Sequence, residues 1–428
     1  MRQRLTTGTR APAVPTSRSR RWLLTVLAGA PLIASCSGKE RADAAGPQDG
    51  PGGPGRAGVA DGPAGVLGAN FNEDPSDVTF PALEALSVSW LRGFVPMSDV
   101  DGAVSAQPAV RTLLAARGKG YGTLLSMKFQ NVHRPVPSPG SQAMNDELAR
   151  VDRLLDVVMG QVNILTIGNE PFLETREADR NARLNAFYEK VAEHVIAYRR
   201  KRFPSGCPTR LYMGALNHLD WPGGQTAATE RWMAFVKKTR EIEGVDIHPH
   251  VDSAEGAQKY VDYVLPRLRA DQRFLVTEFS LVLLWKKHMG STVPAPFARR
   301  YGLPADLTVW QLLKQAVAHP VPEQQWRDFL SMSPWYESHQ HFMRDQVERF
   351  RGTGRLAVAT YGIAQAAAMV RDLGPEKPPW LLNSLYANRT VEHSGSGELP
   401  HNYPVFDDFR ALQRAADRRP VHTGKTPT

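Results

Sequence analysis

Two short stretches decide the fold of this chain: Ile164-Leu165-Thr166-Ile167-Gly168-Asn169-Glu170-Pro171 and Phe274-Leu275-Val276-Thr277-Glu278-Phe279-Ser280. Each is an apolar run that ends in a single glutamate. A run of this length is typical of a strand that is buried on both faces, as in a parallel sheet. The carboxyl ends of such strands are where parallel α/β folds hold their functional groups. We therefore expect Glu170 and Glu278 to face each other across one pocket.

Six further apolar runs alternate along the chain with segments of helical periodicity. Together with 164–169 and 274–278 they predict eight strands, the others being 68–71, 88–92, 122–127, 210–215, 245–248 and 356–361. Apolar residues recur at helical spacing within 148–158, 184–198 and 260–268. Eight strands alternating with helices predict an α/β protein with a (β/α)8 TIM barrel.

The connection after the seventh predicted strand is long and spans about residues 281–352. It contains helical patterns at 310–318 and 335–350, and another helical pattern near 407–417 closes the chain. An insertion after a barrel strand lies at the functional face of the barrel. We therefore predict one barrel domain over residues 66–428, with a long helical insertion after strand seven that shapes the substrate cleft.

The first 36 residues have the layout of a bacterial export signal. Six arginines precede an apolar run from Trp22 to Ala34, and no acidic residue occurs before Glu40. This run of 13 residues is too short to span a bilayer, which takes roughly 20. The sequence Ile33-Ala34-Ser35-Cys36 resembles the lipobox of bacterial lipoproteins, in which the cysteine becomes the lipidated N-terminus. The alternative is an ordinary signal peptide with a chance cysteine.

Residues 37–65 are rich in glycine, proline and small side chains and lack large apolar ones. Such a segment cannot bury enough apolar surface to offset its ordering entropy, so we interpret it as a flexible tether. A cleaved pro-segment would have the same composition. With a lipid on Cys36, the expected location is the cell envelope, on the periplasmic or extracellular face of a membrane.

The charge of the chain does not indicate a nucleic-acid partner. The formal net charge is +9, of which the six arginines before Cys36 contribute +6, which leaves +3 for the remainder. No dense basic block with interleaved aromatic residues follows. The chain has two cysteines, Cys36 and Cys207, so a lipidated Cys36 leaves Cys207 without a disulfide partner.

With these features the chain resembles the clan A glycoside hydrolases, which are retaining (β/α)8 enzymes. In that clan the acid/base glutamate follows an asparagine at the end of strand four, and the nucleophile glutamate ends strand seven. Asn169-Glu170-Pro171 lies on the fourth predicted strand, and Glu278 on the seventh. The resemblance covers about residues 65–418.

The resemblance implies a role for each matching residue. Glu170 would be the general acid and then the general base, with a raised pKa, and Glu278 would be the ionised nucleophile. Their carboxyl groups would lie about 5–5.5 Å apart for a retaining mechanism. Asn169 would bind the 2-hydroxyl of the sugar, and Arg92, at the end of strand two, would lie beneath Glu278 and keep it ionised.

The chain departs from the clan pattern on strands six and eight. His248-Pro249-His250 stands where the clan has His-x-Tyr, so His250 could donate to the nucleophile in place of tyrosine. Strand eight ends Ala359-Thr360-Tyr361 without the usual tryptophan, so Tyr361 could substitute, or Trp380 could reach in from the following loop. We further expect Asn217, Trp221 and Trp285, which follow strands five and seven, to line the substrate site.

The predicted function is thus an exported retaining glycoside hydrolase that acts on a β-linked oligo- or polysaccharide and needs no cofactor. His248 and His250 are spaced to bind one metal, but barrel metallohydrolases carry His-x-His on strand one, so we expect no metal. The alternative from another class is a catalytically retired barrel that binds glycans as an envelope lipoprotein, because a fold does not fix a function.

Overall fold

The computed structural model describes residues 62–417 except 72–74, 77 and 396. The predicted export signal, Cys36 and most of the tether therefore lie outside the described residues. Among the helices of the described residues, none combines the length and the apolarity that a membrane crossing needs.

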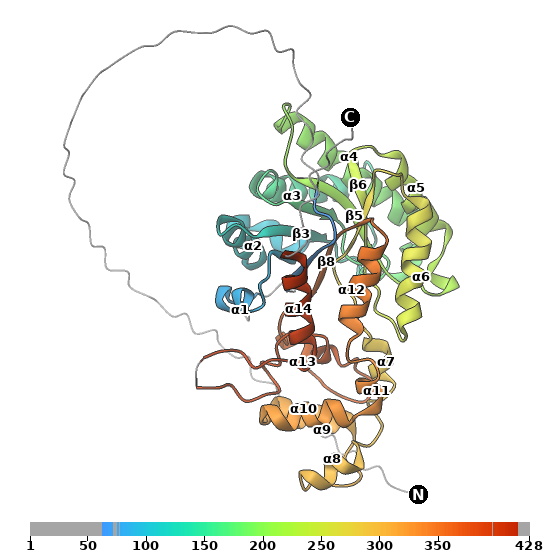
Figure 1. Ribbon diagram of the computed structural model, residues 1–428. Coiled ribbons are helices and arrows are strands. Elements are labelled where there is room, and N and C mark those ends of the chain that lie inside the picture. The colour runs from blue at the N-terminus through green and yellow to red at the C-terminus, as the bar shows by residue number, and fades with distance from the viewer. Residues whose placement is uncertain (1–61, 72–74, 77, 396, 418–428) are drawn as a thin grey trace, which may run out of the picture. The chain divides into compact units, whose positions relative to one another are not determined.

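The described part of the chain contains eight parallel strands that close into a barrel in chain order, which confirms the predicted (β/α)8 fold (Figure 1). Each predicted strand overlaps an observed one. The strands are β1 Val66–Asn70, β2 Trp90–Pro96, β3 Gly122–Lys128, β4 Ile164–Ile167, β5 Arg210–Leu216, β6 Ile242–Ile247, β7 Arg273–Val276 and β8 Leu356–Gly362. Strand β2 continues four residues beyond Arg92, so Arg92 lies within the strand and not at its end as predicted.

Helices surround the strands in the alternation that the periodicity predicts (Figure 1). They are α1 Phe80–Ala85, α2 Pro108–Gly118, α3 Gln142–Val158, α4 Ala182–Arg202, α5 Ala227–Lys238, α6 Ala254–Val264, α7 Val282–Lys286, α8 Ala295–Arg300, α9 Val309–Ala318, α10 Glu323–Met332, α11 Pro334–Glu337, α12 Phe342–Gly352, α13 Ala367–Val370 and α14 Val405–Asp417. Short 3₁₀ helices span Met97–Asp101, Val104–Ala106, Glu177–Asp179, Pro222–Gly224, Leu265–Arg267 and Trp380–Leu382.

Local capping explains where several helices begin. The side chains of Ser141 and Ser253 accept the backbone N–H groups of Met144 and Gly256 at the starts of α3 and α6. Thr226 and Thr229 form a reciprocal capping box at α5. These contacts satisfy N–H groups that have no partner inside the helix.

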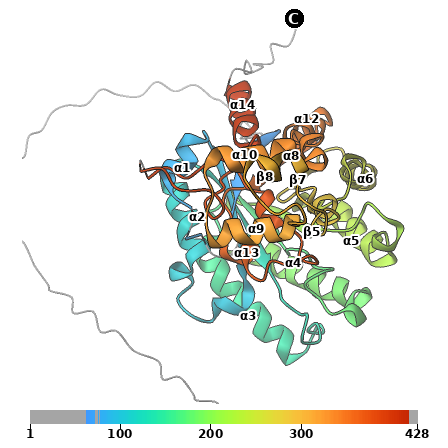
Figure 2. The same cartoon turned by 90° about the horizontal axis from the view of Figure 1, so that it is seen from below.

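The connection between β7 and β8 contains the helices α7 to α12. Figures 1 and 2 show α8, α9 and α10 at one end of the barrel, and from below they lie in front of the strands. The single helix predicted over 335–350 is wrong, because α11 ends at Glu337 and α12 begins at Phe342. The hydroxyl of Ser338 bonds to the carbonyl oxygen of Pro334, a side-chain contact that competes with continuation of the helix.

The barrel interior is apolar near the amino ends of the strands and polar near their carboxyl ends. The lower layer is a separate apolar cluster of Leu124, Ile164, Tyr212, Leu275, Ala357 and Val358. Arg92 is paired in register with Leu124 across β2 and β3 and is fully buried. Nearer the carboxyl ends of β3, β6 and β8, the buried side chains include the polar residues Ser126, Asp246 and Thr360.

We predict that the layer between the barrel and α4 carries much of the stability. Phe187 is fully buried, and its ring contacts those of Phe129 and Tyr188 edge to face at 5.2 and 5.1 Å. Phe187→Ala should lower the free energy of unfolding by about 3–5 kcal/mol, because it removes buried area and leaves a cavity. The half-exposed Trp221 provides the control: Trp221→Ala should change it by less than about 0.5 kcal/mol in the same urea titration. Equal losses in both variants would contradict this assignment of the core.

Candidate active site

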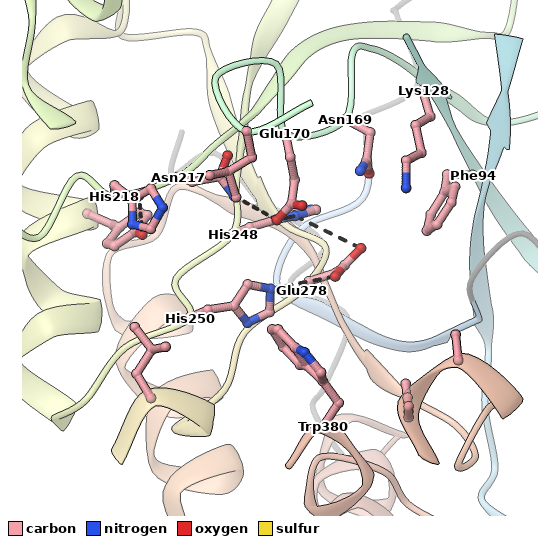
Figure 3. A pocket seen from close by; sticks show the side chains of 15 residues that line it. Phe94, Lys128, Asn169, Glu170, Asn217, His218, His248, His250, Glu278 and Trp380 are labelled. Atoms are coloured by element: carbon pink, nitrogen blue, oxygen red, sulfur yellow. Dashed lines mark hydrogen bonds and ion pairs between the residues drawn. The ribbon is translucent and has the colours of Figure 1, made fainter. Parts of the chain in front are cut away.

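The loop after β4 places Glu170 in an unusual backbone conformation. Gly168 has φ +111°, and a Cβ there would lie 2.2 Å from the carbonyl oxygen of Gly214, so only glycine fits. Glu170 has φ +47°, in the left-handed region that costs a non-glycine residue free energy. Its carbonyl oxygen accepts the N–H groups of Leu173 and Glu174 at 2.9 and 2.8 Å, which stabilises this turn. The turn directs the Glu170 side chain into the pocket (Figure 3).

The end of β7 is fixed by two buried side chains from the neighbouring part of the barrel. The amide of Asn70 and the hydroxyl of Thr360 both donate to the carbonyl oxygen of Thr277, at 2.9 and 2.5 Å. Glu278 is the next residue. Its carboxylate lies opposite Glu170, with His248 between them and His250 beside it (Figure 3).

Arg92 is the central cation of the site. From inside the barrel its Nη1 donates to Glu278 Oε1 at 2.5 Å, and its Nη2 donates to Asn169 Oδ1 at 2.6 Å. Nε and Nη2 also donate to the hydroxyl of Ser126 at 3.3 and 3.2 Å. A buried guanidinium needs such partners, because an unpaired buried charge is strongly destabilising.

Glu278 is held in its ionised form. Burial raises the pKa of the carboxyl group, but the positive charges of His248 and Arg92, and the nearby His250, outweigh it and hold the pKa well below its usual range. His250 Nε2 lies 3.6 Å from Glu278 Oε2, and its Nδ1 lies 2.8 Å from the hydroxyl oxygen of Ser280. A carboxylate in this setting stays charged at neutral pH.

Glu170 is held by different partners. Its Oε1 accepts the side-chain amide of Asn217 at 2.7 Å and lies 3.2 Å from His248 Nδ1. Burial raises the pKa of Glu170, but the hydrogen bond and the charge of His248 outweigh it and lower the pKa below its ordinary value. The expected raised pKa of Glu170 is therefore wrong, because His248 supplies a charge that an apolar site would not.

The two carboxylates share one cavity of about 410 Å³. Its wall also contains Asn169, Asn217, His248, His250 and Trp380, and Figure 3 shows Phe94 and Lys128 on the side away from His218. The ring of Trp380 meets that of His250 edge to face at 4.8 Å. Trp380 is thus the aromatic residue that the loop after β8 supplies to this pocket.

Three residues that were predicted to line the substrate site are not part of the cavity wall. The prediction is wrong for Tyr361 and Trp285, which are buried, and for the half-exposed Trp221 it stays a prediction. Tyr361 is buried against Phe279 at 5.3 Å, because Thr360 points into the barrel and side chains alternate along a strand. Trp285 is buried against Tyr336 of α11 at 5.5 Å. Trp221 is half-exposed and meets His218 edge to face at 6.1 Å, outside the cavity wall.

Other wall residues carried little signal in the sequence. Lys128 is the last residue of β3, and this position could have indicated a site residue. Its Nζ lies 3.0 Å from Glu174 Oε1 and 4.6 Å from the centroid of the Phe94 ring. Tyr260 belongs to the helical apolar pattern of α6, yet its hydroxyl accepts the backbone N–H of His218 at 2.6 Å. The sequence reasoning also missed Leu173, Leu283, Ala368 and Met369, which come from loops and from the short helices α7 and α13.

The spacing of four side chains would also allow a metal ion. Glu170, His248, His250 and Glu278 each offer a ligand atom, and all four atoms lie within 4.8 Å of one another. Arg92, however, donates to the Glu278 carboxylate from below. A fixed positive charge at this distance opposes a second cation, so the donor set suits an ion-paired carboxylate site better than a metal.

Comparisons with known proteins give only distant structural matches. No protein-family model matches the chain, and no curated protein matches it. Among solved structures, one match is a family 39 glycoside hydrolase from Bacteroides cellulosilyticus WH2, at 14% identity and a TM-score of 0.38, covering 52% of each chain. This chain thus matches about half the length of that enzyme.

Two further matches cover more of the chain. A glucosidase from Croceicoccus marinus matches at 9% identity and a TM-score of 0.43, over 83% of this chain and 68% of the other. A β-mannanase from Thermomonospora fusca matches at 13% identity and a TM-score of 0.36, over 74% and 86%. At these values the function has to be argued from the residues of the site itself.

Proposed function

We propose that this protein is a retaining glycoside hydrolase that cleaves a β-linked glycan by double displacement. One observation carries the proposal: carboxylate oxygens of Glu170 and Glu278, from the ends of β4 and β7, lie within 4.8 Å of each other in one cavity. Retaining glycosidases need carboxyl groups about 5–5.5 Å apart, whereas inverting ones leave room for a water molecule at about 6.5–9.5 Å.

Glu278 is the nucleophile in this mechanism. It must be ionised to attack the anomeric carbon, and Arg92 and the neighbouring histidines favour that form. Its side chain is 20% exposed, so one face of the carboxylate remains open to the cavity. Attack from that face forms a glycosyl-enzyme ester, which water then hydrolyses.

Glu170 is the general acid and then the general base. Its partners are Asn217 and His248, neither of which is a permanent cation, so a proton is held more readily on Glu170 than on Glu278. In the first step Glu170 protonates the leaving oxygen. In the second step it removes a proton from the attacking water.

The remaining wall residues suit a sugar ring. The Oδ1 of Asn169 accepts from Arg92, so its amide nitrogen remains to donate to a hydroxyl group of the sugar. Trp380 offers an aromatic surface, which binds the apolar face of a sugar, and Lys128 offers a donor on the opposite side. The helical insertion between β7 and β8 supplies Leu283 to the wall and favours an oligo- or polysaccharide over a small glycoside.

We also propose that the protein is exported and anchored to a membrane by a lipid on Cys36. The support is in the sequence: the arginine-rich start, the short apolar run from Trp22 to Ala34 and the small residues directly before Cys36. The Gly/Pro-rich segment 37–65 would let the barrel reach a glycan away from the membrane surface.

The catalytic assignment predicts distinct products from two variants. Glu278→Ala and Glu170→Ala should each lower kcat on β-glycosides by about 10³-fold or more, because each removes a reacting group. Added azide should rescue both, giving an α-glycosyl azide with Glu278→Ala and a β-glycosyl azide with Glu170→Ala, as ¹H NMR of the products can show. The control is Glu189→Ala, an acid of α4 that pairs with Arg231 and is not part of the cavity wall, and it should leave kcat unchanged. A protein that binds glycans but hydrolyses none, with binding unchanged in both variants, would favour the retired barrel instead.

The charge on Arg92 predicts a shift of the acidic limb of the pH profile. Because the guanidinium helps to hold the pKa of Glu278 below its usual range, Arg92→Met should raise that pKa, and activity should be lost at a higher pH than in the parent. The expected displacement of the kcat/KM limb is about one pH unit or more. Arg92→Lys keeps the positive charge and should shift the acidic limb less than Arg92→Met does. An unchanged limb in Arg92→Met would show that Arg92 does not control the ionisation of Glu278.

The anchor predicts a change in localisation from one substitution. Cys36→Ala should abolish incorporation of radiolabelled palmitate and move the protein from the membrane fraction to the soluble fraction of the expressing cells. The second cysteine provides the control, since Cys207→Ala should leave both properties unchanged. Palmitate labelling that persists in Cys36→Ala would refute the lipoprotein assignment.

A further inference from the structure

A chain of buried hydrogen bonds runs behind Glu170 and ends at a second carboxylate. Asp246 of β6 contacts Thr277, Thr277 contacts His248, and His248 contacts Glu170. Asp246, Thr277 and His248 are each 0% exposed. The proposed roles of Glu170 and Glu278 give no function to Asp246 or Thr277.

The donors in this chain fix the position of one proton on His248. The backbone N–H of Thr277 donates to Asp246 Oδ1 at 3.1 Å, and the hydroxyl of Thr277 donates to Oδ2 at 2.6 Å. The Thr277 oxygen can then only accept from His248 Nε2, which lies 2.8 Å away. Nε2 must therefore carry a proton, and Nδ1 is the nitrogen that gains or loses one. Nδ1 lies 3.2 Å from Glu170 Oε1.

Charged groups from several strands face His248. Glu278 Oε1 lies 3.9 Å from Nδ1, Asp246 Oδ2 lies 3.8 Å from Nε2, and the His250 ring centroid is 5.9 Å from that of His248. Burial lowers the pKa of His248, but Glu278, Glu170 and Asp246 outweigh it and raise the pKa above its ordinary value. Burial raises the pKa of Asp246, whereas the charges of His248 and Arg92 and the two hydrogen bonds from Thr277 act to lower it.

We propose that Asp246 and Thr277 are positioning residues that hold one exchangeable proton between His248 Nδ1 and Glu170 Oε1, and so keep the general acid supplied. This rests on the proposed role of Glu170. In the first step the proton passes from Glu170 to the leaving oxygen, which leaves a neutral His248 and an ionised Glu170. In the second step the proton from the attacking water returns to the pair, so no proton is gained or lost over the cycle.

Kinetics of three variants of the full-length protein test this role. Thr277→Val removes the oxygen that accepts the Nε2–H group of His248, and Asp246→Asn removes the negative charge that faces this group. Either change should lower the pH at which the pair of His248 and Glu170 loses its exchangeable proton. For glycosides with a poor leaving group, the basic limb of the kcat/KM profile should move to lower pH by about one unit. At pH values above that limb, kcat/KM should be about tenfold lower than in the parent. Dinitrophenyl glycosides, which leave without protonation, should be hydrolysed as by the parent. Thr277→Ser keeps the hydroxyl and should restore the parent profile.

A second readout does not depend on activity. Long-range ¹H–¹⁵N NMR of the histidine rings, with His248→Gln to assign the signals, should show Nε2 protonated throughout the titration and Nδ1 as the nitrogen that titrates. A neutral ring protonated on Nδ1 would overturn the proposal, since it requires Thr277 to donate to His248. An unmoved basic limb in Thr277→Val would also overturn it. If the protein shows no glycosidase activity but His248 has the expected Nε2–H tautomer, the proposed function is rejected and the hydrogen-bond chain is retained.

Discussion

The burial of one guanidinium group constrains the whole site. Arg92 is fully buried in the middle of β2, where water cannot solvate it, so its donors must be satisfied by protein. Ser126 from β3, Asn169 from the loop after β4 and Glu278 after β7 accept them. One side chain of β2 thereby fixes groups from three other parts of the barrel, and the loops that carry Asn169 and Glu278 are held to the distance at which the two glutamates face one cavity.

The same constraint separates the roles of the two carboxylates. Glu278 receives the permanent charge of Arg92, whereas Glu170 receives an amide hydrogen from Asn217 and contacts a histidine that can give up its proton. Two acidic groups of equal intrinsic strength thus acquire different environments on opposite sides of one cavity. The barrel interior is polar below this cavity, through Ser126, Asp246, Thr277 and Thr360, and this polar layer lets charged groups lie there without being left unpaired.

The sequence predicted the fold well, because parallel strands buried on both faces appear as uninterrupted apolar runs. All eight predicted strands overlap observed ones, and the two strand-ending glutamates do line one cavity. The aromatic residues were predicted poorly. Whether a tryptophan after a strand faces the cavity, the core or solvent depends on loop geometry, and Trp285 packs into the insertion while Trp380 reaches the site. Asp246 and Thr277 read as ordinary strand residues, because only the closed barrel brings their side chains together beneath Glu170.

Covalent labelling of the nucleophile tests the central claim most directly. The protein would be incubated with a panel of 2-deoxy-2-fluoro-β-glycosides that carry an activated leaving group, followed by digestion and mass spectrometry of the peptides. The account predicts that at least one sugar forms a stable adduct and that the adduct maps to Glu278, with no label in Glu278→Gln. An adduct on Glu170 would contradict the assignment of the two carboxylates. A glycan-binding protein that no member of the panel labels would contradict the retaining mechanism.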